Sequence, residues 1–135
     1  MDFNIFGKKP QDLSGKNLSY IVSTELSPYR LYANKSNSAI LFVRIKNISK
    51  DSLLTSLDVK LPQKLGLNQN LLLKEKKIQV GEIEPRKEKE VKIEIFGNIN
   101  TDAGEYTLNL STISHFRDYS HEINRITKQI ALKVI

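Results

Sequence analysis

The chain of 135 residues contains no cysteine, no tryptophan and only one methionine. Without cysteine it can form neither a disulfide framework nor a thiolate-bound zinc or iron–sulfur site, and it has no cysteine nucleophile. The core must therefore be stabilised by packing alone. A chain of this length can achieve this, because it buries roughly two thirds of its unfolded surface on folding. We expect one compact domain that needs no cofactor.

Long hydrophobic runs are missing as well. Residues 1–30 include Lys8 and Lys9 but no apolar stretch of the kind found in signal peptides. No later stretch approaches the roughly 20 apolar residues that cross a membrane as a helix. We therefore expect a soluble, cytoplasmic protein.

Charge of one sign is not concentrated anywhere, although the formal net charge is +6 and the isoelectric point is near 9.5. The densest charged region, residues 74–92, holds seven basic and five acidic residues, and no aromatic residue lies between Phe42 and Phe96. A surface that follows phosphates needs basic residues gathered on one face, with aromatic residues for stacking. Lysine also outnumbers arginine sixteen to five, which favours a solubilising role over phosphate recognition.

What the sequence does contain is a succession of short alternating segments separated by turn residues. The segment Leu71–Leu73 could be a short buried strand or a helical turn, since periodicity cannot separate the two. No window shows the apolar stripe and capping signals of a long helix. We predict an all-β sandwich of two antiparallel sheets with seven or eight strands. The segments with the clearest alternation are 18–26, 39–45, 57–61, 78–83, 91–95, 106–110 and 126–135.

The run Asp-Ala-Gly-Glu-Tyr-Thr-Leu at 102–108 resembles the corner of immunoglobulin-like domains. In these domains a tyrosine near the start of a late strand turns its hydroxyl back onto the main chain a few residues upstream. The resemblance implies this role for Tyr106. We also expect a positive φ at Gly104 and capping of the turn by Asp102. The resemblance at this corner implies an immunoglobulin-like sandwich over residues 17–135.

A wider resemblance extends from Ala39 to Leu110. It is carried by Leu41–Asn47, Val59–Pro62, Val80–Pro85 and Gly104–Leu108, which are similar in order and spacing to CARDB-type sandwich domains of bacteria and archaea. The resemblance implies a non-catalytic interaction module, of a kind often attached to cell-surface or carbohydrate-active proteins.

Candidate chemistry is confined to the segment between the last two predicted strands, residues 114–122, which holds both histidines. A metal site would need His115, His121 and a carboxylate from Asp118 or Glu122 to converge, and a flexible loop does not impose that geometry. A serine hydrolase is a weaker interpretation, because a base adjacent in sequence to its nucleophile cannot usually also be held by a third group. We expect no catalytic, cofactor-binding or metal site.

The same segment is a better candidate for a contact surface. Phe116, Arg117 and Tyr119 are of types enriched at binding hot spots, and they fall within four positions. The alternative is that Phe116 tucks under the loop and Tyr119 covers it. Residues 1–16 are expected to form either an N-terminal arm that docks on a partner or an extra edge strand, with the edge strand favoured.

These observations predict a non-catalytic protein-interaction or assembly module that presents loops and sheet edges to a partner. The alternative is a carbohydrate-binding accessory domain of the adhesion-related sandwich type, although the lack of tryptophan disfavours it. An enzyme would need a pocket with a perturbed acid, base or metal, which the residue inventory hardly offers. We expect a protein partner rather than a nucleic acid, a membrane or a small-molecule substrate.

Overall fold

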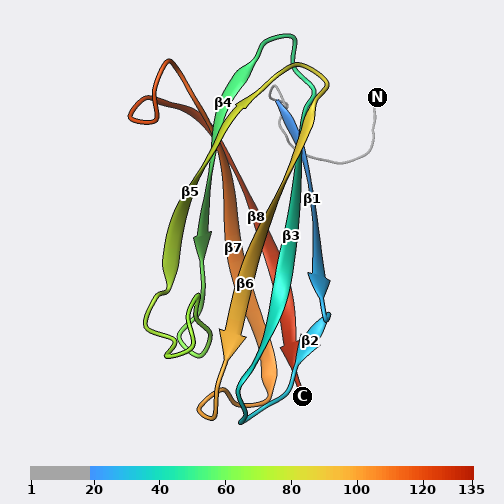
Figure 1. Cartoon of the computed structure of the whole chain (residues 1–135), viewed down its shortest axis with the longest axis vertical. Helices are drawn as coiled ribbons and strands as arrows, with labels where there is room; N and C mark the ends of the chain where they lie inside the picture. Colours follow the sequence, from blue (N-terminus) through green and yellow to red (C-terminus); the bar gives the residue numbers. More distant parts are fainter. Residues whose placement is uncertain (1–18) are drawn as a thin grey trace, which may run out of the picture.

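Extended strands form the framework of the domain. The computed structural model describes residues 19–135, so the predicted arm at residues 1–16 lies outside the described residues. Every regular element within 19–135 is a strand, which confirms the all-β prediction, and no helix there could cross a membrane. The strands are β1 (Tyr20–Ser27), β2 (Arg30–Leu31), β3 (Asn37–Asn47), β4 (Leu53–Lys60), β5 (Glu75–Ile83), β6 (Glu88–Gly97), β7 (Gly104–His115) and β8 (Glu122–Val134) (Figure 1).

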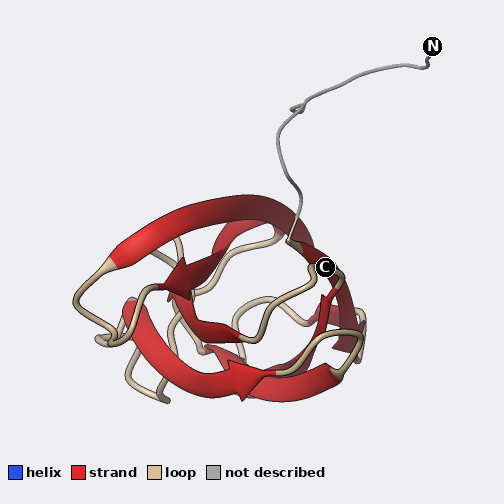
Figure 2. Ribbon diagram, turned by 90° about the horizontal axis from the view of Figure 1, so that it is seen from above, coloured by secondary structure: helices blue, strands red, loops and turns tan. Residues whose placement is uncertain are grey.

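The strands form two sheets, which curve around a common core (Figure 2). The small sheet has the order β1-β3-β6 and the large sheet the order β2-β8-β7-β4-β5. All pairs are antiparallel except β2 with β8, so the prediction of a fully antiparallel sandwich was wrong at this edge. Because Pro28 cannot donate to a ladder, the chain leaves β1 there, and β2 joins the other sheet beside β8.

Alternation along the strands places the core between the two sheets. In β3, the residues Ala39, Leu41, Val43 and Ile45 are at most 1% exposed. Each fully buried leucine or isoleucine of this kind contributes roughly 1.5–3 kcal/mol. The outer face of β3 is only half covered, since Arg44 is exposed. Opposite β3, the large sheet contributes Leu57, Val59, Leu108, Leu110 and Leu132 to the same core.

Two segments differ from the expectations. Strand β7 continues through His115, so the loop between the last two strands spans 116–121 rather than 114–122. The segment Leu71–Leu73 is neither a strand nor a helical turn. The backbone N–H of Leu72 donates to the side-chain oxygens of Asn68 and Asn70, and Leu71 has a φ of 60°. Asparagine side chains therefore fix an irregular turn here.

Asn47 joins the turns at one end of the sandwich. Its side chain is completely buried at the end of β3. The Nδ2 group donates to the carbonyl oxygens of Ile83 at 2.7 Å and Asp51 at 2.8 Å, and Oδ1 accepts from the backbone N–H of Ser49 at 2.8 Å. One side chain therefore links the β3–β4 turn to the end of β5.

Candidate functional site

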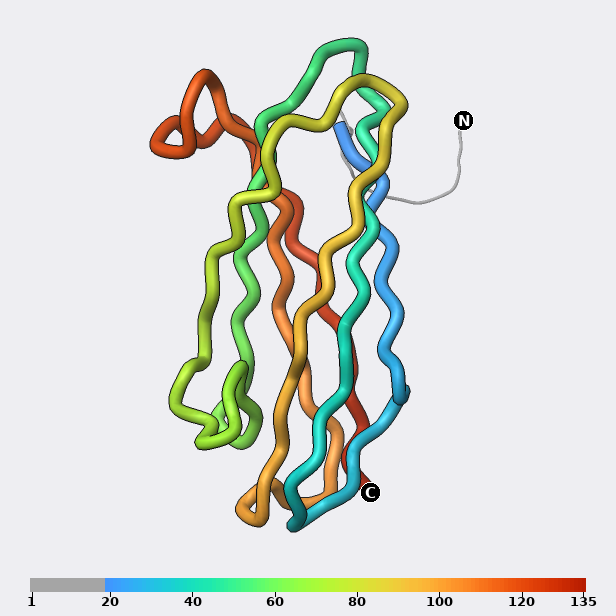
Figure 3. The backbone as a smooth tube through the Cα atoms, in the orientation of Figure 1, coloured from blue at the N-terminus to red at the C-terminus, as the bar shows by residue number. Residues whose placement is uncertain are grey.

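The loop Phe116–His121, here called the hairpin tip, joins β7 to β8 and projects from one end of the sandwich (Figure 3). Its ends are closed by a hydrogen bond from the Phe116 N–H to the His121 carbonyl at 2.8 Å. The Asp118 N–H donates to the Phe116 carbonyl at 2.8 Å, which makes a γ-turn centred on Arg117 with a φ of 72°. A γ-turn with positive φ is rare and strained.

Asp118 fixes the second half of the hairpin tip. Its Oδ1 accepts hydrogen bonds from the Ser120 hydroxyl at 2.5 Å, the Ser120 N–H at 2.9 Å and His121 Nδ1 at 2.8 Å. The Ser120 hydroxyl, followed by His121, lowers the pKa of Asp118 from 3.8 to about 2. The carboxylate is therefore ionised at neutral pH and holds the turn.

Tyr119 fastens the hairpin tip to the large sheet. Its hydroxyl accepts the backbone N–H of Gly81 at 3.0 Å, and its ring meets that of His115 edge to face with centroids 5.2 Å apart. Gly81 lies in β5 where the register with β4 shifts, and its φ is 96°. Such a bulge disrupts the ladder locally and leaves backbone groups for other acceptors. Tyr119, which the sequence suggested as a contact residue, therefore anchors the loop to the large sheet.

Phe116 does not tuck under the loop. The residue is 56% exposed, and the Arg117 guanidinium carbon lies 5.1 Å from the centroid of its ring. Ile123, at 60% exposed, lines the same hollow of about 440 Å³. With Leu53 and Leu54 they form a continuous surface, here called the tip patch: Leu53, Leu54, Phe116, Arg117 and Ile123.

Sequence reasoning missed Ile123 and Leu54, because their faces depend on register. Ile123 has the opposite phase to the apolar positions of β8, and Leu54 lies opposite His115 in the β4–β7 pair. The sequence does carry one sign of such residues, which is an apolar residue at a position where the alternation of its strand predicts a polar one. Such a residue points away from the core.

The buried polar groups of the large sheet make a second cluster next to the hairpin tip. His115 Nε2 and Ser56 Oγ are 2.7 Å apart, which joins β7 to β4. Within residues 19–135, His115 Nδ1 has no hydrogen-bond partner, so nothing there orients the ring as the third member of a triad would. The buried Asp58 carboxylate has Oδ2 3.8 Å from Arg125 Nη1. Arg125 also donates to both Glu122 oxygens, at 3.0 and 3.1 Å.

The two histidines do not converge. His115 is buried against Ser56, whereas His121 is exposed and bonded to Asp118. In the part of the chain that the structure describes, no group of three histidine, cysteine or acidic side chains is placed to hold a metal ion.

The predicted corner lies at the opposite end of the sandwich. The Tyr106 hydroxyl donates to the Asp102 carbonyl, four residues upstream, at 2.7 Å. Gly104 has a φ of 157°, which confirms the expected positive φ. The Asp102 carboxylate accepts from Asn34 Nδ2 at 3.3 Å and lies 3.7 Å from Lys64 Nζ, so it connects neighbouring loops. Within residues 19–135 these contacts of the Asp102 carboxylate are with side chains and not with backbone N–H groups of its turn, so the predicted capping by Asp102 was wrong. In the preceding turn, Asn98 Oδ1 accepts the N–H of Asn100 at 2.8 Å.

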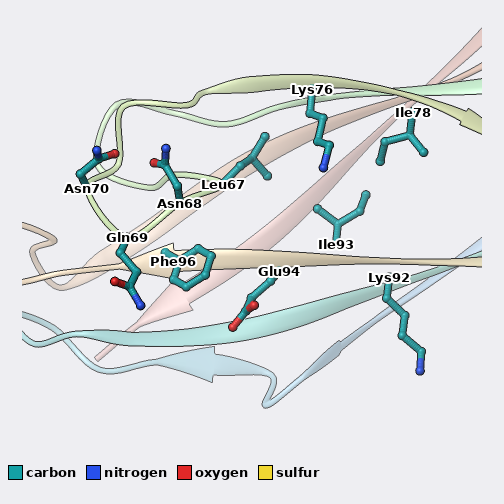
Figure 4. Close-up of a pocket in the computed structure, with 10 residues that line it drawn as sticks. All are labelled: Leu67, Asn68, Gln69, Asn70, Lys76, Ile78, Lys92, Ile93, Glu94 and Phe96. Atoms are coloured by element: carbon teal, nitrogen blue, oxygen red, sulfur yellow. The ribbon is translucent and has the colours of Figure 1, made fainter.

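A groove of about 670 Å³ runs between β5 and β6, the neighbouring edges of the two sheets (Figure 4). Lys76 and Ile78 point into it from β5, and Ile93 points into it from β6. Leu67 and Phe96 line one end. The groove combines an apolar floor with a charged rim.

The chain matches no protein-family model and no curated protein. The resemblance to CARDB-type domains, drawn from four short segments, therefore stays a prediction. The functional interpretation depends on the geometry of the hairpin tip and of the sheet edges.

Proposed function

We propose that this domain is a non-catalytic protein-interaction module of the immunoglobulin-like type that binds a protein partner through the tip patch. The fold assignment is supported by the strand order, in which the chain crosses repeatedly between two sheets, and by the bond from the Tyr106 hydroxyl to the Asp102 carbonyl. Loops at the end of such a sandwich are suited to recognition, because a rigid scaffold positions them.

The observation that carries the proposal is an exposed aromatic–arginine pair on a loop that is already ordered. Phe116 and Arg117 are displayed at the surface, while Asp118 and Tyr119 hold the backbone beneath them. A preformed loop loses little conformational entropy when it binds. The strained φ of Arg117 supports the same interpretation, since strain persists where surrounding contacts impose it and often accompanies function.

Affinity capture from native cell extract tests the proposal. We expect the double variant Phe116→Ala, Arg117→Ala to fold normally and to retain at least about tenfold less partner, equivalent to about 1.4 kcal/mol of binding energy. The matched control is Tyr29→Ala, Arg30→Ala, because Arg30 lies over the Tyr29 ring at 5.2 Å and Tyr29 is 69% exposed. Equal capture by wild type and the double variant would exclude the tip patch.

The alternative, carbohydrate binding, draws support from two exposed tyrosines near β2. Tyr29 and Tyr32 are 69% and 47% exposed. However, Arg30 lies 5.8 Å from the Tyr32 ring centroid and Lys35 Nζ lies 5.5 Å from it, so cations occupy positions that a stacked sugar would need. Glycan-array binding that is lost in Tyr29→Ala and Tyr32→Ala would favour this alternative.

A further inference from the structure

The groove between β5 and β6 lies where the small sheet stops. The small sheet has three strands and ends at β6, whereas the large sheet has five and ends at β5. Beyond the β6 edge, the inward-facing Ile78 of β5 stays only partly buried. Ile93 of β6 faces it from the other rim (Figure 4). The apolar floor of the groove therefore continues the core outward.

The chain itself begins a fourth strand at one end of this groove. Gly66 forms an antiparallel bridge with Phe96, in which the Gly66 N–H donates at 3.1 Å and the Phe96 N–H donates at 2.8 Å. The chain then turns away, and Leu71 packs so closely against Gly66 that a Cβ there would lie 2.4 Å from the Leu71 Cα. The remaining edge of β6 is left without a neighbouring strand among residues 19–135.

The open edge presents a regular set of backbone groups. Along an antiparallel strand, residues two apart direct their N–H and C=O to the same side. Phe96 directs both toward Gly66, so Glu94, Lys92 and Glu90 direct theirs the same way. In the described chain these groups point into the space beside the groove. They offer donors and acceptors in the spacing that an added strand requires.

On the outer face of the β6 edge, Lys92 lies between Glu90 and Glu94, and both of these carboxylates have hydrogen-bond partners in the small sheet. The Glu90 carboxylate is bonded to Arg44 Nε at 3.1 Å, and the Glu94 carboxylate accepts from the Ser38 hydroxyl at 2.7 Å. Among the residues that the structure describes, no carboxylate lies within 4 Å of the ammonium groups of Lys92 or Lys76. Lys76 points into the groove, whereas Lys92 points away from it and its Nζ lies 5.6 Å from the centroid of the Phe42 ring on the outer face of the small sheet (Figure 4). An acidic side chain on the outer face of an added strand could therefore pair with Lys92.

We propose that an extended segment of a protein partner adds to the β6 edge as a fourth strand of the small sheet, with apolar side chains in the groove and an acidic residue opposite Lys92. This inference deepens the proposed function. It rests on that function only because both treat the domain as a protein-binding module. The tip patch takes no part, since it lies at the β7–β8 loop and not at this edge.

Amide hydrogen exchange measured by NMR on the full chain is the first test. In the free protein, the amides of Lys92 and Glu94 should exchange freely, whereas those of Val91 and Ile93 should be protected by β3. The probe is a nine-residue peptide of alternating threonine and valine with glutamate at its centre. Saturating peptide should slow exchange at Lys92 and Glu94 at least about tenfold.

Two methylated peptides separate strand addition from other contacts. Methyl groups on the threonine and glutamate nitrogens remove the N–H groups that face β6 and should abolish binding. Methyl groups on the valine nitrogens face away from β6 and should leave binding intact. Equal behaviour of the two methylated peptides would overturn strand addition.

Two variants of Lys92 and one control variant locate the edge. Lys92→Pro removes an N–H that points away from β3, so the sheet should tolerate it while peptide affinity falls at least about tenfold. Lys92→Glu keeps the backbone intact and should weaken the same peptide severalfold, whereas Lys50→Glu in the exposed β3–β4 turn should not.

The double variant Phe116→Ala, Arg117→Ala should bind the peptide as wild type does. If wild type does not bind the peptide but captures partner in a way that the double variant loses, only this inference is overturned. If wild type binds the peptide but the double variant captures as much partner as wild type, only the proposed function is overturned. Protection of Lys92 and Glu94 in the free chain would also overturn the inference. If that protection grows with protein concentration, a second copy occupies the edge; if it does not, the chain covers its own edge.

Discussion

Asn47 shows how much of the structure can depend on one side chain. Replacing it with alanine leaves the buried Ile83 carbonyl and the half-buried Ser49 N–H without these protein partners. We expect Asn47→Ala to lower the free energy of unfolding by about 2–4 kcal/mol in urea denaturation. Asn100→Ala, at an exposed position, should change it by less than about 0.5 kcal/mol. A loss below 1 kcal/mol for Asn47→Ala, taking that value as roughly one net hydrogen bond, would contradict the linking role.

Tyr106 makes a weaker contribution because its hydrogen bond is exposed to solvent. Removing the hydroxyl in Tyr106→Phe deletes the 2.7 Å bond to the Asp102 carbonyl, but water can reach that carbonyl. We expect a loss of about 0.5–1 kcal/mol in denaturant unfolding. Tyr29→Phe is the control, since that ring is 69% exposed. Identical unfolding midpoints for wild type and Tyr106→Phe would argue against a stabilising corner.

Asp118 makes the order of the hairpin tip depend on pH. Its pKa is about 2 in the folded protein, against an ordinary value of 3.8. A lowered folded pKa adds stability that is fully present above the ordinary value and is lost as pH falls through the folded value. We expect the Asp118 carboxyl carbon to titrate near pH 2 by NMR, and to titrate closer to 3.8 in Ser120→Ala. A wild-type midpoint near 3.8 would contradict the hydrogen-bonded turn.

Among the elements, the bulge in β5 and the hairpin tip stabilise each other. The Gly81 N–H finds its acceptor in the Tyr119 hydroxyl. We expect Tyr119→Phe to speed amide exchange at Gly81 and to broaden the NMR signals of the hairpin tip, while the β4–β7 pairing stays protected. Unchanged protection at Gly81 would mean that the loop is held by packing against His115 instead.

Strands with a regular apolar alternation could be predicted from the sequence, whereas those set by tertiary pairing could not. β1 and β3 show clear period-two patterns and lie close to their expected ranges, whereas β6 and β8 are found where expected but begin earlier than the sequence predicts. β2 has only two residues, too few for any period, and exists because it pairs with β8. β7 was predicted too short, because Thr112 and Ser114 look exposed in sequence although both are buried.

Buried polar contacts explain why β7 was predicted too short, and they limit how much of the candidate site can be predicted from the sequence. The Tyr20 hydroxyl, from the small sheet, is 2.7 Å from Thr55 Oγ1 of the large sheet, and burial raises the pKa of Tyr20. The bond between Ser56 and His115 likewise joins residues far apart in sequence. Residue types alone could suggest Phe116 as a contact residue. The neighbours that complete the tip patch and the groove depend on register, which a single sequence does not reveal.

At the scale of the whole molecule, the topology should set a slow folding rate. The central strand β3 pairs with β6, and β4 pairs with β7, so distant segments must meet before either sheet forms. We expect refolding in milliseconds to seconds, as in other sandwiches rich in non-local pairs. With five tyrosines and no tryptophan, stopped-flow tyrosine fluorescence is the suitable probe. Complete refolding within roughly 100 microseconds would contradict this expectation.

The anchoring of the hairpin tip divides its residues into those that fix the backbone and those that are displayed. The tip's side-chain hydrogen bonds come from Asp118, Tyr119, Ser120 and His121, so the side chains at 116, 117 and 123 can be exchanged without removing any of them. A combinatorial library varied at these three positions would inherit a preformed backbone. Because the chain lacks cysteine, its members would fold under reducing conditions, which makes the domain a scaffold for selecting affinity reagents that work inside cells.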